Sequence, residues 1–260
     1  MVKQHLENLW QGFKRVIVIR ILIAVWQALP SIGIIDARSL PPFSEVIKGL
    51  VHLIVSGELA DDFLASLQRS VSGFVLATAV AIPLGFLMGW FKRFERIADP
   101  LIQICRNTAT LALYPVFILV FGLGELSKIG IIFWGSIWPI LINTIEGVRS
   151  VEPILIKAAK SMSTPNLTLF RKVIFPAAVP SIITGLRISA TRAVVILVAA
   201  EMLGAQAGLG YLIFDARNKY EVPTMYAGIL VLIMLGMTVN YLIVGLEKQV
   251  TRWKGNVEES

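Results

Sequence analysis

Six long apolar segments constrain the fold of this chain more than any other feature of its sequence. The segments cover residues 16–34, 70–91, 101–121, 129–147, 179–201 and 223–246. Each has about the 20 residues that an α-helix needs to cross a bilayer. Hydrophobic residues make up 56% of the whole chain, which is more than an ordinary soluble domain contains. The sequence therefore predicts an all-α integral membrane protein with about six transmembrane helices.

Lysine and arginine gather at alternate ends of these segments, which predicts the orientation of the chain. One set of ends carries Lys3, Lys14, Arg15, Lys92, Arg93, Arg96, Arg149, Lys157, Lys160, Arg171, Lys172, Lys248, Arg252 and Lys254. In the loop between the first two segments, acidic residues instead outnumber basic ones. Because positively charged loops stay in the cytoplasm, both termini and the long loop 148–178 are expected there. The net charge of +7 then reflects topology and not nucleic-acid binding.

A polar, basic stretch at residues 149–172 interrupts the apolar segments and is longer than a simple connection needs to be. Ser150 is a candidate N-cap for a first short helix. Thr164 followed by Pro165 has the pattern of a second N-cap with proline in the first turn. Two small surface helices are therefore predicted at about 151–172, and this range is called the coupling segment below.

The coupling segment is amphipathic. Leu155, Ala158, Ala159 and Met162 recur at the i, i+3, i+4 and i+7 spacing of a narrow helical stripe. In the second predicted helix, Leu169 and Phe170 lie on one side and Arg171 and Lys172 on the other. Such helices either rest on anionic lipid or are gripped by another protein, and the residues alone leave both readings open.

Residues that perform catalysis or bind metals are scarce in the sequence. The single cysteine, Cys105, lies in a predicted span, and the two histidines, His5 and His52, are far apart. No phosphate-binding loop of the Gly-x-x-x-x-Gly-Lys-Ser/Thr type occurs. The chain is therefore expected not to be an enzyme and to bind no cofactor or metal of its own.

Polar side chains inside the apolar segments are candidate contacts for a transported solute. Arg192 lies well within the fifth segment, where a central charge costs roughly 2.5–3.5 kcal/mol and usually faces a cavity or a partner. Arg192, with Arg106, is a candidate for stabilising an anion in transit. The alternative for Arg192 is an internal ion pair, for instance with Glu201 or with a neighbouring helix. Asn107 and Thr108 could either bind a polar solute or join helices to one another.

Glu201 lies where the fifth apolar segment ends. It is a candidate for an outer gate, and the alternative is a structural ion pair with Arg217 or Lys219. Acidic residues otherwise avoid the centres of the predicted spans. Their absence there disfavours a carrier driven by an ion gradient.

Several stretches resemble the permeases of bacterial ATP-binding-cassette importers. The cytoplasmic EAA motif of these permeases is similar to the residues Ala158, Ala159, Pro176, Pro180, Gly185, Leu186 and Arg187. The stretches 121–128, 139–144, 199–203 and 208–218 resemble the nitrate, sulfonate and taurine branch of the family. The resemblance covers nearly the whole chain from Pro42 onward.

Several residues depart from the pattern of the family, and three of these departures bear on function. Lys157 stands where the EAA motif is acidic, and Ser163 stands where it has a glycine. Arg192 occupies a place where relatives usually carry a small or apolar residue. The first two differences bear on the grip on a partner, and the third bears on the substrate. The other departures are Ala109 and Thr110, which stand where members of the branch often have a pair of prolines.

The resemblance implies a fold, a location and a set of partners. The fold is that of the type I importer permeases (MetI-like), in a bacterial cytoplasmic membrane. A cytoplasmic segment 1–15, a permease domain 16–247 with its core at 66–247, and a cytoplasmic tail 248–260 are expected. Two ATPase subunits would hold ATP and Mg, a second copy of the chain would complete the path as a homodimer, and an extracytoplasmic solute-binding protein would deliver the cargo. The residues expected to couple to the ATPase are Leu155, Lys157, Ala158, Ala159, Met162, Ser163, Leu169, Phe170, Arg171 and Pro176.

The implied substrate is a small anion. Aliphatic sulfonates such as taurine come first, with nitrate, bicarbonate or an aromatic carboxylate as close variants. Two functions of another class are a secondary carrier powered by an ion gradient and a membrane-embedded enzyme. Only the importer requires a separate ATPase subunit.

Overall fold

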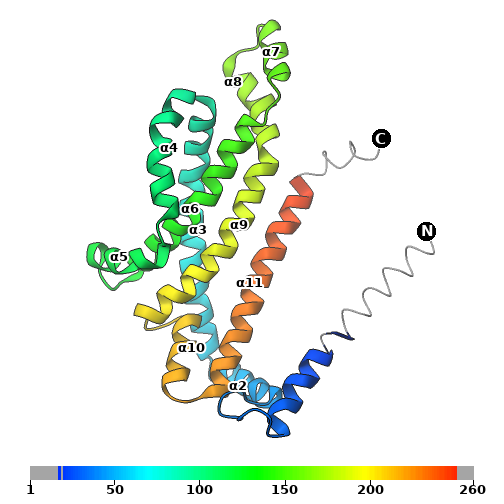
Figure 1. Ribbon diagram of the computed structural model, residues 1–260, viewed down its shortest axis with the longest axis vertical. Coiled ribbons are helices and arrows are strands. Elements are labelled where there is room, and N and C mark those ends of the chain that lie inside the picture. Colours follow the sequence, from blue (N-terminus) through cyan, green and yellow to red (C-terminus); the bar gives the residue numbers. More distant parts are fainter. Residues whose placement is uncertain (1–16, 19, 251–260) are drawn as a thin grey trace, which may run out of the picture. The chain divides into compact units, whose positions relative to one another are not determined.

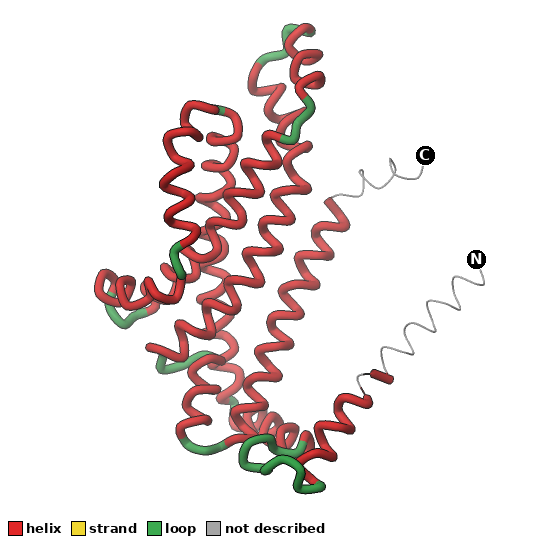
Figure 2. Tube along the Cα trace, viewed as in Figure 1, coloured by secondary structure: helices red, strands yellow, loops and turns green. Residues whose placement is uncertain are grey.

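The computed structural model describes residues 17–18 and 20–250, and every regular element in that part of the chain is a helix (Figure 1). A helix without a label covers residues 20–31. The labelled elements are α2 (Phe43–Ser56), α3 (Glu58–Trp90), α4 (Lys92–Asn107), η1 (Thr110–Leu113), α5 (Tyr114–Phe121), α6 (Glu125–Arg149), α7 (Pro153–Ser161), α8 (Asn166–Leu169), η2 (Phe170–Ile174), α9 (Phe175–Gly204), α10 (Leu209–Asn218) and α11 (Val222–Val250). Short loops connect most of them (Figure 2). The predicted all-α fold is confirmed.

Four of the six predicted spans are confirmed as long apolar helices. They are Glu58–Trp90, Glu125–Arg149, Asn166–Gly204 and Val222–Gly245. Each begins earlier than the predicted segment, because hydropathy marks only the most apolar part of a helix. The first predicted span, 16–34, lies partly outside the described residues, and the helix at 20–31 falls within it.

The third predicted span, 101–121, is wrong as a single helix. α4 ends at Asn107, and η1 and α5 continue only after a bend of 89°. Thr108 and Ala109 have extended backbone, and Thr108 Oγ1 donates a hydrogen bond to the Ile104 carbonyl (2.9 Å). Asparagine and threonine favour helices weakly, in part because their side chains bond to nearby backbone groups. The polar run at the end of α4 therefore breaks the helix.

The contacts of the chain divide it into two compact units. Of the described residues, the first unit contains those up to Asp61 together with Leu212–Val231, and the second contains Asp62–Tyr211 and those from Leu232 to Val250. The first unit has a core of its own, formed by Val46, Leu53, Leu212 and Ala227. All the site residues discussed below, except where stated, belong to the second unit.

In the second unit, a stripe of small residues lets α3 pack closely on α6. The stripe has a buried glycine or alanine at every fourth position: Gly73, Ala77, Ala81 and Gly85. A Cβ added at Gly73 would lie 2.6 Å from Ile132, and one added at Gly85 would lie 2.5 Å from Thr144. Small residues at such spacing bring helix backbones together in membranes, where packing and not the hydrophobic effect drives association.

The helices α6 and α9 pack against each other along much of their length (Figure 1). Glycines again mark the closest approaches. A Cβ at Gly147 would lie 2.9 Å from the carbonyl oxygen of Ala178, and one at Gly185 would lie 2.9 Å from that of Pro139. This pair of helices is the frame that positions the residues described next.

Candidate functional site

A buried ion network joins α3, α6 and α9. At its centre, Arg69 is 5% exposed and Glu201 is 1% exposed. Arg69 Nη1 donates to Glu201 Oε1 (2.7 Å), while Arg69 Nε and Nη2 donate to the two oxygens of Glu125 (2.5 and 2.8 Å). Lys128 Nζ adds a second cation 3.0 Å from Glu125 Oε1. Because the bidentate fork of an arginine has one favourable geometry, this network specifies how the three helices meet.

The same network holds the loop between α9 and α10. Glu201 accepts hydrogen bonds from Ser66 Oγ (2.8 and 2.9 Å) and from the backbone N–H of Gly210 (2.9 Å). Arg69 Nη1 also donates to the carbonyl of Ala207 (2.6 Å). Every oxygen of the buried carboxylate is therefore satisfied, as burial of a charge requires.

Gly208 in this loop and Gly210 in the first turn of α10 both have to be glycine. Gly208 has a φ of +124°, and a Cβ added there would lie 2.3 Å from Glu201 Oε1. A Cβ at Gly210 would lie 2.6 Å from the carbonyl oxygen of Val198. A side chain at either position would push the loop away from the carboxylate.

The expected ion-pair partners of Glu201 are wrong. Neither Arg192 nor Arg217 nor Lys219 pairs with it; Lys219 instead lies 2.7 Å from Asp215, in the first unit. The physical reason is that the loop after α9 folds back, so that its amides and Arg69 surround the carboxylate.

Arg69 is the residue that sequence reasoning missed. The apolar segment was placed at 70–91, and a charge just before a span needs no partner. The available signal was the run from Glu58 to Arg69, which contains no proline or glycine and therefore extends α3 back through Ser66 and Arg69.

The candidate path residues Arg106, Asn107 and Thr108 lie at the end of α4 and in the break that follows. Arg106 and Asn107 are exposed. η1, which begins two residues after Thr108, packs against α9. In membranes, non-helical backbone is tolerated only where protein buries it or where it lines a water-filled cavity. The structure therefore brings this break against the helix that carries Arg192.

Arg192 is exposed on α9, and among the described residues it forms no ion pair. The alternative of an internal pair with Glu201 is wrong, because Arg69 occupies that carboxylate. Arg187, one and a half turns earlier on the same helix, does have a partner, since its Nη1 lies 3.6 Å from Glu247.

Both N-caps expected in the coupling segment are wrong. Ser150 ends α6 and its Oγ donates to the Gly147 carbonyl (3.0 Å), while α7 begins only at Pro153. α8 begins at Asn166, with Pro165 and not Thr164 in the N-cap position. Pro153 is well suited to the first position of α7, because its φ is already helical and it has no N–H to satisfy.

The two predicted helices of the coupling segment differ in how they are supported. One face of α7 is uncovered, with Leu155 49% and Met162 81% exposed and Ala158 also exposed. Ala159, on the neighbouring side of α7, packs against a buried cluster. The second helix is continuous with α9, so that one helix runs over 39 residues, Asn166–Gly204.

The remaining coupling candidates lie at different depths. Lys157, Ser163 and Arg171 are exposed, Phe170 and Pro176 are half-buried, and Leu169 is fully buried. Leu169 therefore supports the segment from within and does not present its side chain to a partner in this conformation.

Ser163 occupies a position that favours glycine. Its φ is +54°, in the left-handed region. Its N–H donates to the Lys160 carbonyl (2.9 Å), and the next N–H, of Thr164, donates to the Ala159 carbonyl (3.1 Å). This pair of hydrogen bonds is the Schellman motif, in which the left-handed residue is usually glycine. The serine that departs from the EAA pattern is thus in a strained conformation.

Several apolar spans, one of them broken, with an exposed amphipathic helix between two others, define a polytopic membrane protein of the transport permease class. Residues 81–252 match the family described as "Binding-protein-dependent transport system inner membrane component". The chain belongs to this family.

Named relatives share most of the chain. SsuC of Bacillus subtilis (strain 168), whose name refers to an aliphatic sulfonates transport permease, is 35% identical over 92% of this chain and 86% of its own. The taurine transport system permease protein TauC of Escherichia coli (strain K12) is 31% identical over 92% of this chain and 88% of its own. The nitrate import permease protein NrtB of Leptolyngbya laminosa is 32% identical over 86% of this chain and 82% of its own. The chain is therefore an ATP-binding-cassette importer permease of the sulfonate, taurine and nitrate branch, and not an enzyme or a secondary carrier.

A solved structure supports the fold. The chain resembles a permease in inward-facing conformations of the MetNI methionine ABC transporter, with a TM-score of 0.68 over 76% of this chain and 98% of that chain. At 17% identity, this likeness bears on the fold alone. The predicted MetI-like architecture is confirmed.

Proposed function

We propose that this permease imports a small organic anion, an aliphatic sulfonate such as taurine, along a path formed by α9 and the break between α4 and η1. The observation that carries the proposal is the exposed guanidinium of Arg192 on a spanning helix, without an ion-pair partner among the described residues. A charge at that depth is costly unless it faces a cavity or a partner. A sulfonate offers three oxygens that accept charge-assisted hydrogen bonds. Nitrate, bicarbonate and aromatic carboxylates are the variants of the same proposal.

The helix break supplies further contacts in this proposal. Arg106 adds a second positive charge, and Asn107 and Thr108 add hydrogen-bonding groups next to backbone that is not helical. Interrupted spans of this kind often form the binding sites of transporters. The substrates named for two of the relatives, taurine and aliphatic sulfonates, agree with an anionic cargo.

The partners follow from the family. Two ATPase subunits, which bind ATP and Mg, dock on the coupling segment, and a second identical permease completes the path. A solute-binding protein delivers the cargo from outside, and both termini of the chain lie in the cytoplasm. The exposed apolar face of α7, with Leu155, Ala158 and Met162, supports this docking because it is uncovered in the single chain.

Glu201 acts in the outer gate of the proposed cycle through its pair with Arg69. The pair ties α3, α6 and the loop at 205–210 together. Rigid-body movements in alternating access break and remake such interfaces. Opening of the outer gate would require Arg69 to separate from Glu201 or from Glu125.

The test uses the complete importer, purified from native membranes with its partners and reconstituted in proteoliposomes. Arg192→Ala should raise the apparent KM for taurine at least tenfold, because hydrogen bonds to charged groups contribute about 1.5–3 kcal/mol, while Arg192→Lys should recover part of the loss. Arg187→Ala removes the same charge from the same helix and serves as the matched control, with the KM unchanged. If Arg192→Ala leaves uptake rate and KM intact and only lowers thermal stability, the proposed substrate role has to be abandoned. Competition by nitrate, bicarbonate and benzoate against labelled taurine distinguishes the anion classes.

A further inference from the structure

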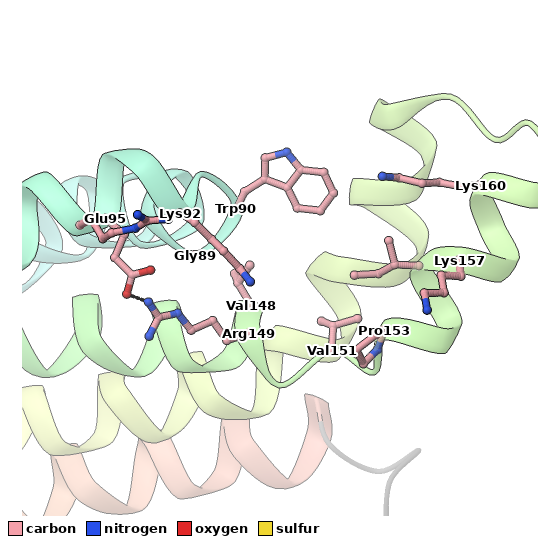
Figure 3. A pocket seen from close by; sticks show the side chains of 12 residues that line it. Gly89, Trp90, Lys92, Glu95, Val148, Arg149, Val151, Pro153, Lys157 and Lys160 are labelled. Carbon is pink, nitrogen blue, oxygen red and sulfur yellow. Dashed lines mark ion pairs between the residues drawn. The ribbon is translucent and has the colours of Figure 1, made fainter.

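A basic cleft lies between the α3–α4 turn and α7 (Figure 3). It has a volume of about 790 Å³ and is lined by five basic residues and one acidic residue: Lys92, Arg96, Arg149, Lys157, Lys160 and Glu95. Arg149 pairs with Glu95. The other four cations have no ion-pair partner within the described part of the chain, so the cleft carries a net charge of about +4.

The cleft lies where two spans end. The spanning helices Glu58–Trp90 and Glu125–Arg149 both finish at residues that line it. Figure 3 shows the indole of Trp90 projecting into the gap between the α3–α4 turn and α7. Tryptophan is enriched at the level of the lipid headgroups, where one side of its ring is apolar and its N–H is polar. The cleft is therefore placed at headgroup depth.

A second, apolar groove meets the cleft at Trp90. This groove has a volume of about 500 Å³ and is lined mainly by Ile82, Phe86, Leu87, Phe91, Phe170 and Phe175. Phe86 packs against Phe170 and Phe175, with ring centroids 5.0 and 5.7 Å apart. A cationic cleft and an apolar groove that both contain Trp90 in their lining match a ligand with an anionic head and a hydrocarbon chain.

The helix α7 presents different faces to the cleft and to its surroundings. Pro153, Ile156, Lys157 and Lys160 line the cleft and follow the i, i+3, i+4 and i+7 spacing of one helical face. Leu155, Ala158 and Met162 belong to another face, which is exposed. Lys157, which is also expected to couple to the ATPase, belongs to the cleft face. The apolar docking face is distinct from it, so an occupant of the cleft would touch α7 without covering Leu155, Ala158 and Met162.

We infer that this cleft binds the phosphate headgroup of an anionic phospholipid, with an acyl chain in the adjoining groove, and that the bound lipid fixes the position of α7. Phosphate accepts charge-assisted hydrogen bonds from lysine and arginine, and each such residue near an anionic lipid surface contributes about 1 kcal/mol. Ile156 and Ala159 already pack α7 against a buried cluster, and the lipid would add a second connection between α7 and the ends of α3 and α6. Anionic lipid thereby sets how firmly the coupling helix is held.

The test is the retention of phosphatidylglycerol by the purified importer, measured by native mass spectrometry, together with the ATPase rate in nanodiscs with and without phosphatidylglycerol. Lys92→Gln/Arg96→Gln removes two charges from the cleft but none from α7. Retention should weaken about 30-fold, the factor that corresponds to about 2 kcal/mol for two charges, and the effect of phosphatidylglycerol on the ATPase rate should be lost. Arg93→Gln/Lys172→Gln removes two exposed charges that do not line the cleft, and it should behave as the unmodified protein.

Each other outcome overturns the inference. Equal losses in the two double variants would mean that only the general surface charge attracts lipid. Full retention by the cleft variant would place the lipid elsewhere. If glycerol phosphate or inorganic phosphate restored the ATPase rate in neutral nanodiscs as well as phosphatidylglycerol does, a soluble anion and not a lipid would be the ligand. Cleft residues that crosslink to the ATPase and retain no lipid would show that a protein partner fills the cleft.

Discussion

Arg69 of α3 and Glu201 of α9 are 132 positions apart in the chain, yet their side chains form a 2.7 Å ion pair that is almost completely buried. Glu125 of α6 binds the other edge of the same guanidinium. Three spanning helices therefore meet at one arginine. The pair is a structural centre of the second unit as well as a proposed element of the outer gate.

Breaking the central pair should strongly destabilise the protein. Arg69→Gln leaves two carboxylates without their common cation, and loss of one partner of a buried pair costs about 3–5 kcal/mol. The double variant Arg69→Gln/Glu201→Gln should lose less free energy of unfolding than the two single variants lose in sum. The measurement is a double-mutant cycle of unfolding in detergent micelles. The exposed pair Arg187–Glu247 is the control, with an expected coupling of about 0–1 kcal/mol; strictly additive losses at Arg69 and Glu201 would contradict the network.

Replacing Gly208 should disrupt the loop after α9. The Gly208→Ala side chain would meet Glu201 Oε1 at 2.3 Å, and the φ of +124° is strained for any residue with a Cβ. We expect a loss of about 2 kcal/mol or more in the free energy of unfolding. Gly236→Ala is the matched control, because it lies in α11 with no heavy atom within 4 Å of the added Cβ. Gly236→Ala should be neutral or slightly stabilising. If Gly208→Ala were as stable as the unmodified protein, the loop would not be held as described.

Restoring glycine at position 163 should stabilise the end of α7. Ser163→Gly relieves the left-handed strain at φ +54°, and the expected gain is about 0.5–1 kcal/mol after the added freedom of the unfolded chain is subtracted. Hydrogen exchange of the α7 amides measures the local stability. Ser163→Ala keeps the strain and should show no slowing of exchange. Slower exchange in both variants, or in neither, would mean that the backbone strain does not limit α7.

A charge on the exposed face of α7 should release the ATPase subunits. Ala158→Asp places a carboxylate beside Leu155 and Met162, where an apolar partner surface would have to desolvate it. Copurification of the ATPase with the tagged permease should fall at least tenfold. Gln206→Asp adds the same charge at an exposed position beyond the other end of α9 and should leave the complex intact. Undiminished copurification with Ala158→Asp would remove α7 from the docking surface.

Much of the fold could be predicted because apolar runs and basic flanks are local signals. The spans near 129–147 and 179–201 lie within α6 and α9. The helix break at Thr108 was not predicted, because hydropathy averages over the polar run from Arg106 to Thr110. Such a break depends on side-chain hydrogen bonds that a mean value does not contain.

The ion network could not be predicted because its partners are distant in sequence. Glu201 was identified as a gate candidate, but nothing in the local sequence points to Arg69 or Glu125 as its partners. Ser163 is different: its departure from glycine was visible in the sequence, and the structure adds the reason why the departure matters, which is the left-handed backbone. Local sequence identified the positions, and only the fold supplied their partners.

The helix Asn166–Gly204 contains both the second half of the coupling segment and, 35 positions further on, the carboxylate of Glu201. At 1.5 Å per residue this distance is about 50 Å. No loop interrupts the helix between these points. A displacement applied at Asn166 would therefore reach Glu201 through one continuous helix, in which the π-helical turn Phe170–Ile174 and Pro180 are the positions where bending is expected. Stiffness of this single helix, more than any relay of side chains, would then determine how faithfully the two ends move together.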